Sequence, residues 1–130
     1  MDLPDDLLAM LRGRSTCYVA TTMPDGSPQL TQTWVDTDGR NLIINTVVGY
    51  QRARNIERAP RVAVSVADGS NPSRYYAIRG RVTRATTNGA AEHIEALAQR
   101  YLGRPYPWYD GPDQTRLMLS IAPESLHSMG

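Results

Sequence analysis

Apolar and polar residues alternate along much of this chain, which is the spacing of strands that bury one face. The segment 61–67 is the clearest, with Val62, Val64 and Val66 on one face and smaller residues on the other. The same period of two predicts further strands over 15–22, 29–36, 42–47, 75–83, 116–122 and 125–128. Gly80 interrupts one of these runs and predicts a bulge or a sharp bend there.

Three segments have helical rather than strand-like spacing. The first begins at 4–6, where a proline and two acids suit a first turn, and it ends at Gly13. A short basic helix follows the strand at 42–47, and a longer helix is expected over 91–102. Asn88 is the predicted N-terminal cap of this last helix.

Tight turns at 24–27 and 38–39 join successive strands as hairpins, and Pro123 is expected to break the last strand. Consecutive hairpins indicate antiparallel pairing, because a parallel connection needs a crossover of about a dozen residues. Six or seven short strands suit a small barrel. We therefore predict a mainly β fold with inserted helices, as a single domain over 1–130.

Composition and charge exclude several classes of function. Hydrophobic residues make up 41% of the chain and the formal net charge is +1, so no global charge favours nucleic acid or a membrane surface. The acidic start is unlike a signal peptide, and no apolar run approaches the roughly 20 residues of a membrane span. Cys17 is the single cysteine, which excludes an intrachain disulfide and fits a reducing cytoplasm. We expect it to be a small buried apolar residue.

The richest candidate chemistry lies at 48–61, where four of the ten residues from Arg52 to Arg61 are arginines. A basic helix that opens directly after a strand is a good anion receptor, since its first turn offers free N–H groups and guanidiniums bind phosphate oxygens in pairs. The alternative is a solvated helix face, on which Glu57 would pair with Arg54.

Five motifs, in order, resemble one family. Asp25-Gly26-Ser27-Pro28-Gln29 is similar to a "D-G-x-P-Q" hairpin, and Arg52-Ala53-Arg54-Asn55-Ile56-Glu57-Arg58-Ala59-Pro60-Arg61 to a "K-x-R-N-[LI]-x-R-D-P-R" segment. Tyr76 to Val82, Tyr101-Leu102-Gly103 and Ile121-Ala122-Pro123 match later elements. These are motifs of the split β-barrel flavin/deazaflavin oxidoreductases, relatives of pyridoxamine 5′-phosphate oxidase. The chain most resembles the branch dependent on coenzyme F420, which is found mostly in actinobacteria. It departs from the pattern at Arg52, usually Lys, and at Ala59, usually Asp.

The resemblance implies a six- to seven-stranded split barrel of the FMN-binding type and a homodimer with cofactor sites at its interface. Coenzyme F420, a deazaflavin with a phosphate and an oligoglutamyl tail, is the expected cofactor, and FMN is the alternative. Arg52 and Arg54 are the main candidates for phosphate and tail contacts. The predicted cofactor-binding residues are Arg52, Arg54, Gln29, Thr31, Gln32, Asn45, Thr46 and Tyr50.

Each of these candidates has a plainer interpretation. Gln29 and Thr31 share one face of their strand and Gln32 lies on the other, so all three cannot line one pocket from a flat strand. Outward-facing polar residues on a half-buried strand would look the same. Asn45 needs a partner if it is buried, and either a cofactor edge or a backbone carbonyl would serve.

Aromatic residues are the candidates for a substrate pocket, namely Tyr75, Tyr106 and Trp108, although the last two could equally anchor their proline-rich loop. Trp34 is expected to fill the core. His93 and His127 have no acid-rich partner segment, and we predict no metal site and no catalytic side chain. That absence agrees with hydride transfer, in which the cofactor carries the reaction.

Three hypotheses remain open. The first is an F420-dependent reductase that passes a hydride to a small unsaturated or electron-poor acceptor in the cytoplasm. The second is an FMN-dependent enzyme like pyridoxamine 5′-phosphate oxidase, although no counterpart of that enzyme's C-terminal substrate segment is evident. The third is a non-catalytic protein that binds F420, flavin or haem.

Overall fold

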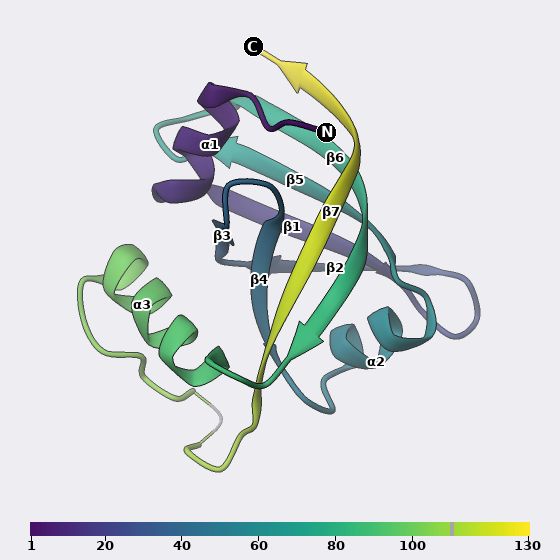
Figure 1. Ribbon diagram of the computed structural model, residues 1–130, viewed down its shortest axis with the longest axis vertical. Coiled ribbons are helices and arrows are strands. Elements are labelled where there is room, and N and C mark those ends of the chain that lie inside the picture. The colour runs from purple at the N-terminus through teal and green to yellow at the C-terminus, as the bar shows by residue number, and fades with distance from the viewer. Residues whose placement is uncertain (110) are drawn as a thin grey trace.

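A seven-stranded antiparallel sheet curls into a half-barrel, with three helices against it (Figure 1). This is a computed structural model, and it describes residues 1–109 and 111–130. The strands are β1 (Thr16–Thr22), β2 (Pro28–Thr33), β3 (Val35–Thr37), β4 (Leu42–Val47), β5 (Arg61–Asp68), β6 (Asn71–Thr86) and β7 (Arg116–Met129). The helices are α1 (Asp5–Arg12), α2 (Gln51–Arg58) and α3 (Ala90–Leu102). The predicted mainly β split-barrel fold is confirmed.

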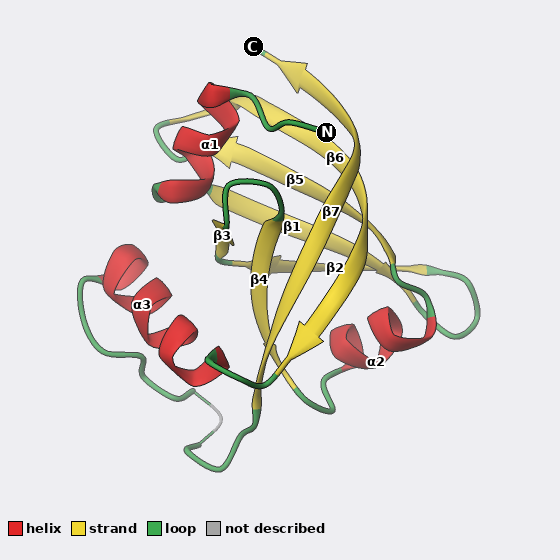
Figure 2. Cartoon of the chain, in the orientation of Figure 1, coloured by secondary structure: helices red, strands yellow, loops and turns green. Residues whose placement is uncertain are grey.

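The core lies inside the curl of the sheet. Val62, Val64 and Val66 of β5 point into it, as their spacing predicts, and Leu7 and Leu11 of α1 cover one end with no exposed surface. In the view of Figure 2, α1 lies near one end of the barrel, whereas α2 and α3 lie near the other end on opposite sides of β4. That arrangement leaves the end of β4 between two helices.

The prediction of one strand over 29–36 was wrong, because the chain changes sheet edge at Trp34. The strand order is β2-β1-β5-β6-β7-β4-β3, so β2 and β3 are the two edges of the sheet. β2 pairs with β1 and β3 pairs with β4, although only Trp34 separates the two in sequence. The barrel is therefore split at this residue. We call the split between the edge strands β2 and β3 the seam of the barrel.

The predicted bend at Gly80 is confirmed, since the pairing of β6 with β7 shifts between Arg79 and Gly80. A Cβ added at Gly80 would lie 2.6 Å from the Ala122 carbonyl oxygen, so the strands approach too closely there for a side chain. The predicted break at Pro123 was wrong: β7 continues to Met129. Pro123 pairs with Gly80 at the register shift, and a bulge tolerates proline inside a sheet.

Two other boundaries differ from the sequence prediction. β6 begins at Asn71 rather than 75 and extends to Thr86, because the reversal before it takes only a tight turn. The N-terminal cap of α3 is Gly89, with φ 75°, and not Asn88. None of the helices in the described residues has the length and apolar character needed to cross a membrane.

Candidate functional site

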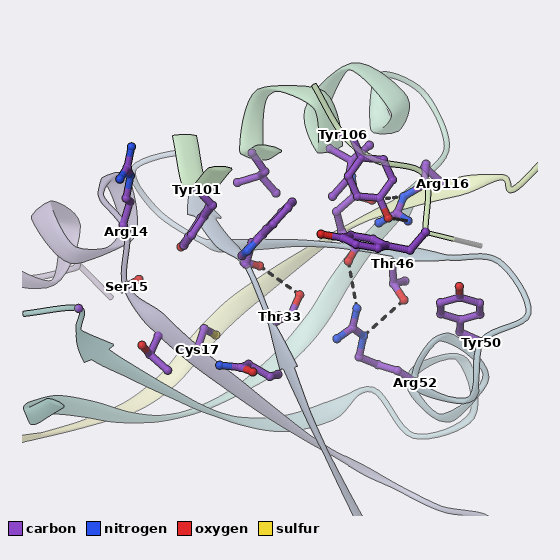
Figure 3. A pocket seen from close by; sticks show the side chains of 18 residues that line it. Arg14, Ser15, Cys17, Thr33, Thr46, Tyr50, Arg52, Tyr101, Tyr106 and Arg116 are labelled. Carbon is purple, nitrogen blue, oxygen red and sulfur yellow. Dashed lines mark hydrogen bonds between the residues drawn. The ribbon is translucent and has the colours of Figure 1, made fainter. Parts of the chain in front are cut away.

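A cavity of about 610 Å³ opens at the seam of the barrel. Residues of β2 and Trp34 form one wall, α3 forms another, and the end of β4 with the start of α2 closes the far side (Figure 3). The loop after α3, the start of β7, residues 14–17 and Gly69 complete it. Its volume falls within the range typical of small-molecule and cofactor sites.

The cavity is strongly cationic. Among its described lining residues are three arginines, Arg14, Arg52 and Arg116, and no aspartate or glutamate. In Figure 3, Arg14 lies at one end and Arg52 and Arg116 at the other. Guanidiniums without carboxylates around a cavity favour an anionic ligand, because a buried cation otherwise lacks a counter-charge.

Arg52 is fixed in direction by polar atoms on two strands. Its Nη1 donates to Thr31 Oγ1 at 3.1 Å, its Nη2 to the Asn45 carbonyl oxygen at 3.0 Å, and its Nε to Thr46 Oγ1 at 3.4 Å. Burial lowers the pKa of Arg52, and the nearby charge of Arg116 lowers it further. Thr31 thus supports Arg52 without itself lining the cavity, whereas Asn45 and Thr46 do both.

Cys17 lies beside Arg52 but cannot neutralise it. Burial raises the pKa of Cys17 to about 12, although the charge of Arg52 opposes this rise. The thiol is therefore neutral at physiological pH, and it is buried, as expected from the sequence. Among the described residues, no carboxylate forms a salt bridge with Arg52.

Arg116, at the start of β7, is a site residue that the sequence analysis missed. Its Nε donates to Asn45 Oδ1 at 2.8 Å and its Nη1 to the Tyr106 hydroxyl at 3.2 Å. The residue is 8% exposed, and its guanidinium carbon lies 5.2 Å from the centre of the Tyr106 ring. An isolated arginine at a strand start carries no local signal, so only the fold reveals this role.

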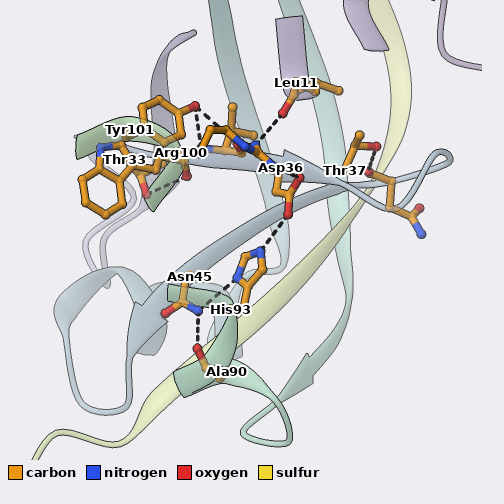
Figure 4. Close-up of polar contacts among 12 residues, drawn as sticks. Leu11, Thr33, Asp36, Thr37, Asn45, Ala90, His93, Arg100 and Tyr101 are labelled. Atoms are coloured by element: carbon orange, nitrogen blue, oxygen red, sulfur yellow. Dashed lines mark hydrogen bonds and ion pairs between the residues drawn. The ribbon is translucent and has the colours of Figure 1, made fainter. Parts of the chain in front are cut away.

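Asn45 links the two guanidiniums to α3. Its Nδ2 donates to the Ala90 carbonyl oxygen at 2.8 Å and lies 3.1 Å from His93 Nδ1 (Figure 4). Because its Oδ1 accepts from Arg116, the amide orientation is set and His93 Nδ1 must be the acceptor. The proton of a neutral His93 is therefore on Nε2, which lies 3.1 Å from Asp36 Oδ2.

His93 thus has a carboxylate partner that its own sequence neighbourhood did not reveal. Asp36 also accepts from Arg100 Nη2 at 2.8 Å. Burial alone would raise the pKa of Asp36, but the hydrogen bonds from His93 and Arg100 outweigh burial and hold that pKa well below its usual value. The carboxylate is accordingly ionised and orients the imidazole behind the cavity.

Flat aromatic rings form part of the cavity wall. Trp34, which was expected to fill the core, is only half-buried and lines the cavity, stacked on Tyr101 with ring centres 5.4 Å apart and planes 9° apart. Tyr106 lines the cavity too, and it meets Trp34 edge-on at 6.3 Å. Trp108 packs edge-on against Tyr106 at 5.3 Å without being a lining residue.

The remaining predicted residues fall into two groups. Gln32 and Tyr50 line the cavity. Three others, Gln29, Arg54 and Tyr75, do not line it. Gln29 Oε1 accepts hydrogen bonds from Thr21 and Asn55, and Tyr75 pairs with Ala67 and Met129 in the sheet. Arg54 is exposed and donates to Gln51, not to Glu57. Arg52, Asn45, Thr46, Gln32, Tyr50 and Tyr106 are the predicted residues that the fold brings together.

Residues 3–130 match the model of the family described as pyridoxamine 5′-phosphate oxidase. The chain belongs to the pyridoxamine 5′-phosphate oxidase family. The resemblance stated from the sequence motifs is thereby confirmed, and it spans nearly the whole chain.

Solved structures agree with membership of the pyridoxamine 5′-phosphate oxidase family. An F420 reductase is 29% identical with a TM-score of 0.81, and the match covers 96% of this chain and 98% of that one. A conserved hypothetical protein from Mycobacterium tuberculosis is 26% identical with a TM-score of 0.75, over 98% of this chain and 84% of that one. General stress protein 26 from Bacillus anthracis shares the fold at 18% identity and a TM-score of 0.66, over 93% and 88%.

Proposed function

We propose that this protein is an F420-dependent reductase that transfers a hydride from reduced deazaflavin to a small unsaturated or electron-poor acceptor. The observation that carries the proposal is the cavity at the barrel seam, where the described lining residues include three arginines, no aspartate or glutamate, and stacked aromatic rings. F420 combines a flat ring system with a phosphate and an anionic tail, so its chemistry fits both features. The likeness to an F420 reductase over nearly the full length of both chains adds support.

In this proposal the cofactor supplies the hydride, and the chain binds, orients and shields it. Arg52 and the Thr46 hydroxyl hold the phosphate, since Arg52 is already directed by Thr31 and Asn45. The Trp34–Tyr101 pair offers a flat apolar wall to a planar ring. No side chain is required to act as nucleophile or general base.

We also propose a homodimer with the cofactor site at its interface, acting in the cytoplasm. Leu30 is 68% exposed and Tyr18 is 40% exposed, on strands β2 and β1. Tyr18 pairs directly with Gln32, a lining residue of the cavity. Apolar side chains this exposed beside an open cavity are suited to a partner subunit, which would also close the site.

An FMN-dependent enzyme is the second candidate, because the family is described by the name of pyridoxamine 5′-phosphate oxidase. Both cofactors carry a phosphate and a tricyclic ring, so the arginines do not separate them. A non-catalytic binder of F420, flavin or haem would use the same cavity without turnover.

Titration of the purified apo-protein separates these possibilities. F420 and FMN are added in parallel and binding is followed by ring fluorescence, after which reduced F420 is offered with a panel of quinones and enones. The proposal expects micromolar or tighter binding of F420 and oxidation of the reduced form by at least one acceptor. Binding of FMN alone would favour the second candidate, and tight binding of F420 with no turnover would favour the non-catalytic role.

A further inference from the structure

We propose that Arg116 forms a second anion subsite in this cavity, for an oxyanion that is either a carboxylate of the acceptor or the phosphate of the cofactor. The inference deepens the proposed function in that it assumes a ligand in the same cavity, but its charge argument does not depend on the identity of the cofactor. It assigns a binding role to a side chain that the motifs do not mark.

The first support is the balance of charge around Arg116. The residue is 8% exposed, and no carboxylate pairs with its side chain among the described residues. Its hydrogen-bond and ring partners among the described residues are an amide oxygen, a phenol hydroxyl and an aromatic ring, all of them neutral, and the nearby charge of Arg52 is also positive. Burying a cation with only neutral partners is costly, and a ligand oxyanion would supply the missing counter-charge.

The second support is the donor that remains. Nε and Nη1 are engaged by Asn45 and Tyr106, whereas Nη2 has no hydrogen-bond partner among the described residues. Arg116 lines the cavity, and Figure 3 shows it on the same side as Tyr106, above Thr46 and Arg52. A guanidinium held by two of its nitrogens can offer the third to an oxygen without losing further freedom.

The third support is the way in which the side chain is held. Asn45 Oδ1 accepts from Arg116, while Asn45 Nδ2 is anchored by Ala90 and His93. His93 is in turn held by the ionised carboxylate of Asp36. This chain of contacts runs from β3 through α3 and β4 to β7, and it fixes the guanidinium before any ligand arrives. Such preorganisation is typical of binding groups, since it avoids an entropic cost on binding.

The two sources of oxyanion predict different behaviour of the same variant. If the anion belongs to the acceptor, cofactor affinity is independent of Arg116, and a planar carboxylic acid binds to the loaded protein better than its neutral amide. If the anion is the cofactor phosphate, Arg116 and Arg52 both contribute to the affinity for the cofactor. Both guanidiniums bond to Asn45, one to its backbone oxygen and one to its side chain, and their charges interact, so both lie on the same side of the cavity.

The test compares Arg116→Gln with wild type and with Arg40→Gln, an exposed arginine in the β3–β4 turn, as the matched control. One arm measures the dissociation constant of F420 by its fluorescence. The other arm titrates the F420-saturated protein with benzoate and, separately, with benzamide. Arg116→Gln should weaken the binding of F420 or abolish the preference for benzoate over benzamide. We expect a change of about tenfold or more in one of the two arms. Arg40→Gln should change neither arm.

A change below about twofold in both arms would overturn the subsite. Should Arg116→Gln fail to fold, Arg116→Lys takes its place, because lysine keeps the charge and should show a smaller loss of affinity in the same arm. If Arg116→Lys loses no affinity and wild type shows no preference for benzoate, the subsite is overturned as well. If wild type binds no F420, the proposed function fails, while benzoate and benzamide titrated into the apo-protein, followed by tryptophan fluorescence, still test Arg116. The two failures are therefore distinguishable.

Discussion

Asn45 shows how much a single side chain contributes to the candidate site. Its backbone oxygen binds Arg52, its Oδ1 binds Arg116, and its Nδ2 binds Ala90 and His93. The sequence could single out Asn45 as a polar residue among apolar neighbours, and its need for partners is met mostly by protein groups. Arg116 and Tyr101 could not be found in this way, because their role depends on contacts between residues distant in the chain.

Replacing Asn45 with alanine should destabilise the fold, because three side-chain hydrogen bonds are lost and the buried groups of Arg116 and Ala90 are left unpaired. We expect a fall of about 2–4 kcal/mol in the free energy of unfolding, measured in urea. Asn71→Ala, at an exposed position at the start of β6, should change it by less than about 0.5 kcal/mol. Equal stability of the two variants would contradict the role of Asn45.

Cys17 should be unreactive in the native protein. Burial raises the pKa of Cys17 to about 12, so the thiolate that reacts with disulfide reagents is scarce at pH 8. A native sample mixed with a chromogenic disulfide at pH 8 should release almost no thiolate dye over minutes, and one equivalent per chain after denaturation. Rapid native reaction would show that the thiol is more open than its 1% exposure indicates.

At the scale of elements, alternating hydrophobicity predicts most strands correctly, because each buries one face. It does not reveal where a continuous strand changes partners, as at Trp34, since both halves keep the same local pattern. It also misjudges Pro123, because the bulge opposite Gly80 that accommodates the proline is a property of two paired strands. The cavity depends on the first of these features, since it opens where the sheet edges part.

The bend in β6 should be intolerant of any side chain at its centre. In Gly80→Ala the new Cβ would lie 2.6 Å from the Ala122 oxygen and 2.9 Å from Ile121 Cγ2, so β6 and β7 must separate. We expect a loss of about 1–3 kcal/mol in unfolding free energy, measured by urea denaturation. The control is Ala77→Ser on the exposed side of the same strand, which should be near neutral. A Gly80→Ala protein as stable as this control would show that the strands are not in close contact.

At the scale of the whole molecule, one ionised network ties α3 to the barrel. Asp36 of β3 holds both His93 and Arg100 of α3, and Arg100 also donates to the carbonyl oxygen of Leu11 in α1. These contacts connect the helix wall of the cavity to the edge strand at the seam. The barrel fold was predictable from the sequence, but this coupling was not, because its charges lie far apart along the chain.

This network should make stability depend on pH in a defined direction. The folded-state pKa of Asp36 is lowered from its ordinary value of 3.8, so its stabilisation is present above that value and is lost as the pH falls below it. The difference in unfolding free energy between wild type and Asp36→Asn should be about 1–3 kcal/mol at pH 7 and should shrink as the pH falls below about 4. A difference that is the same at pH 3 and pH 7 would contradict the assignment.

The most direct test of the account is the affinity of Arg52→Ala for F420, measured by deazaflavin fluorescence beside wild type, Arg54→Ala and Arg40→Ala. Arg52 lines the cavity, whereas Arg54 is exposed on the same helix and lies outside it. If Arg52 holds the anionic arm of the cofactor, its loss should weaken binding by about 1.5–3 kcal/mol, or roughly tenfold to a hundredfold, and the Arg40 variant should bind like wild type. Wild-type affinity in Arg52→Ala would contradict the account.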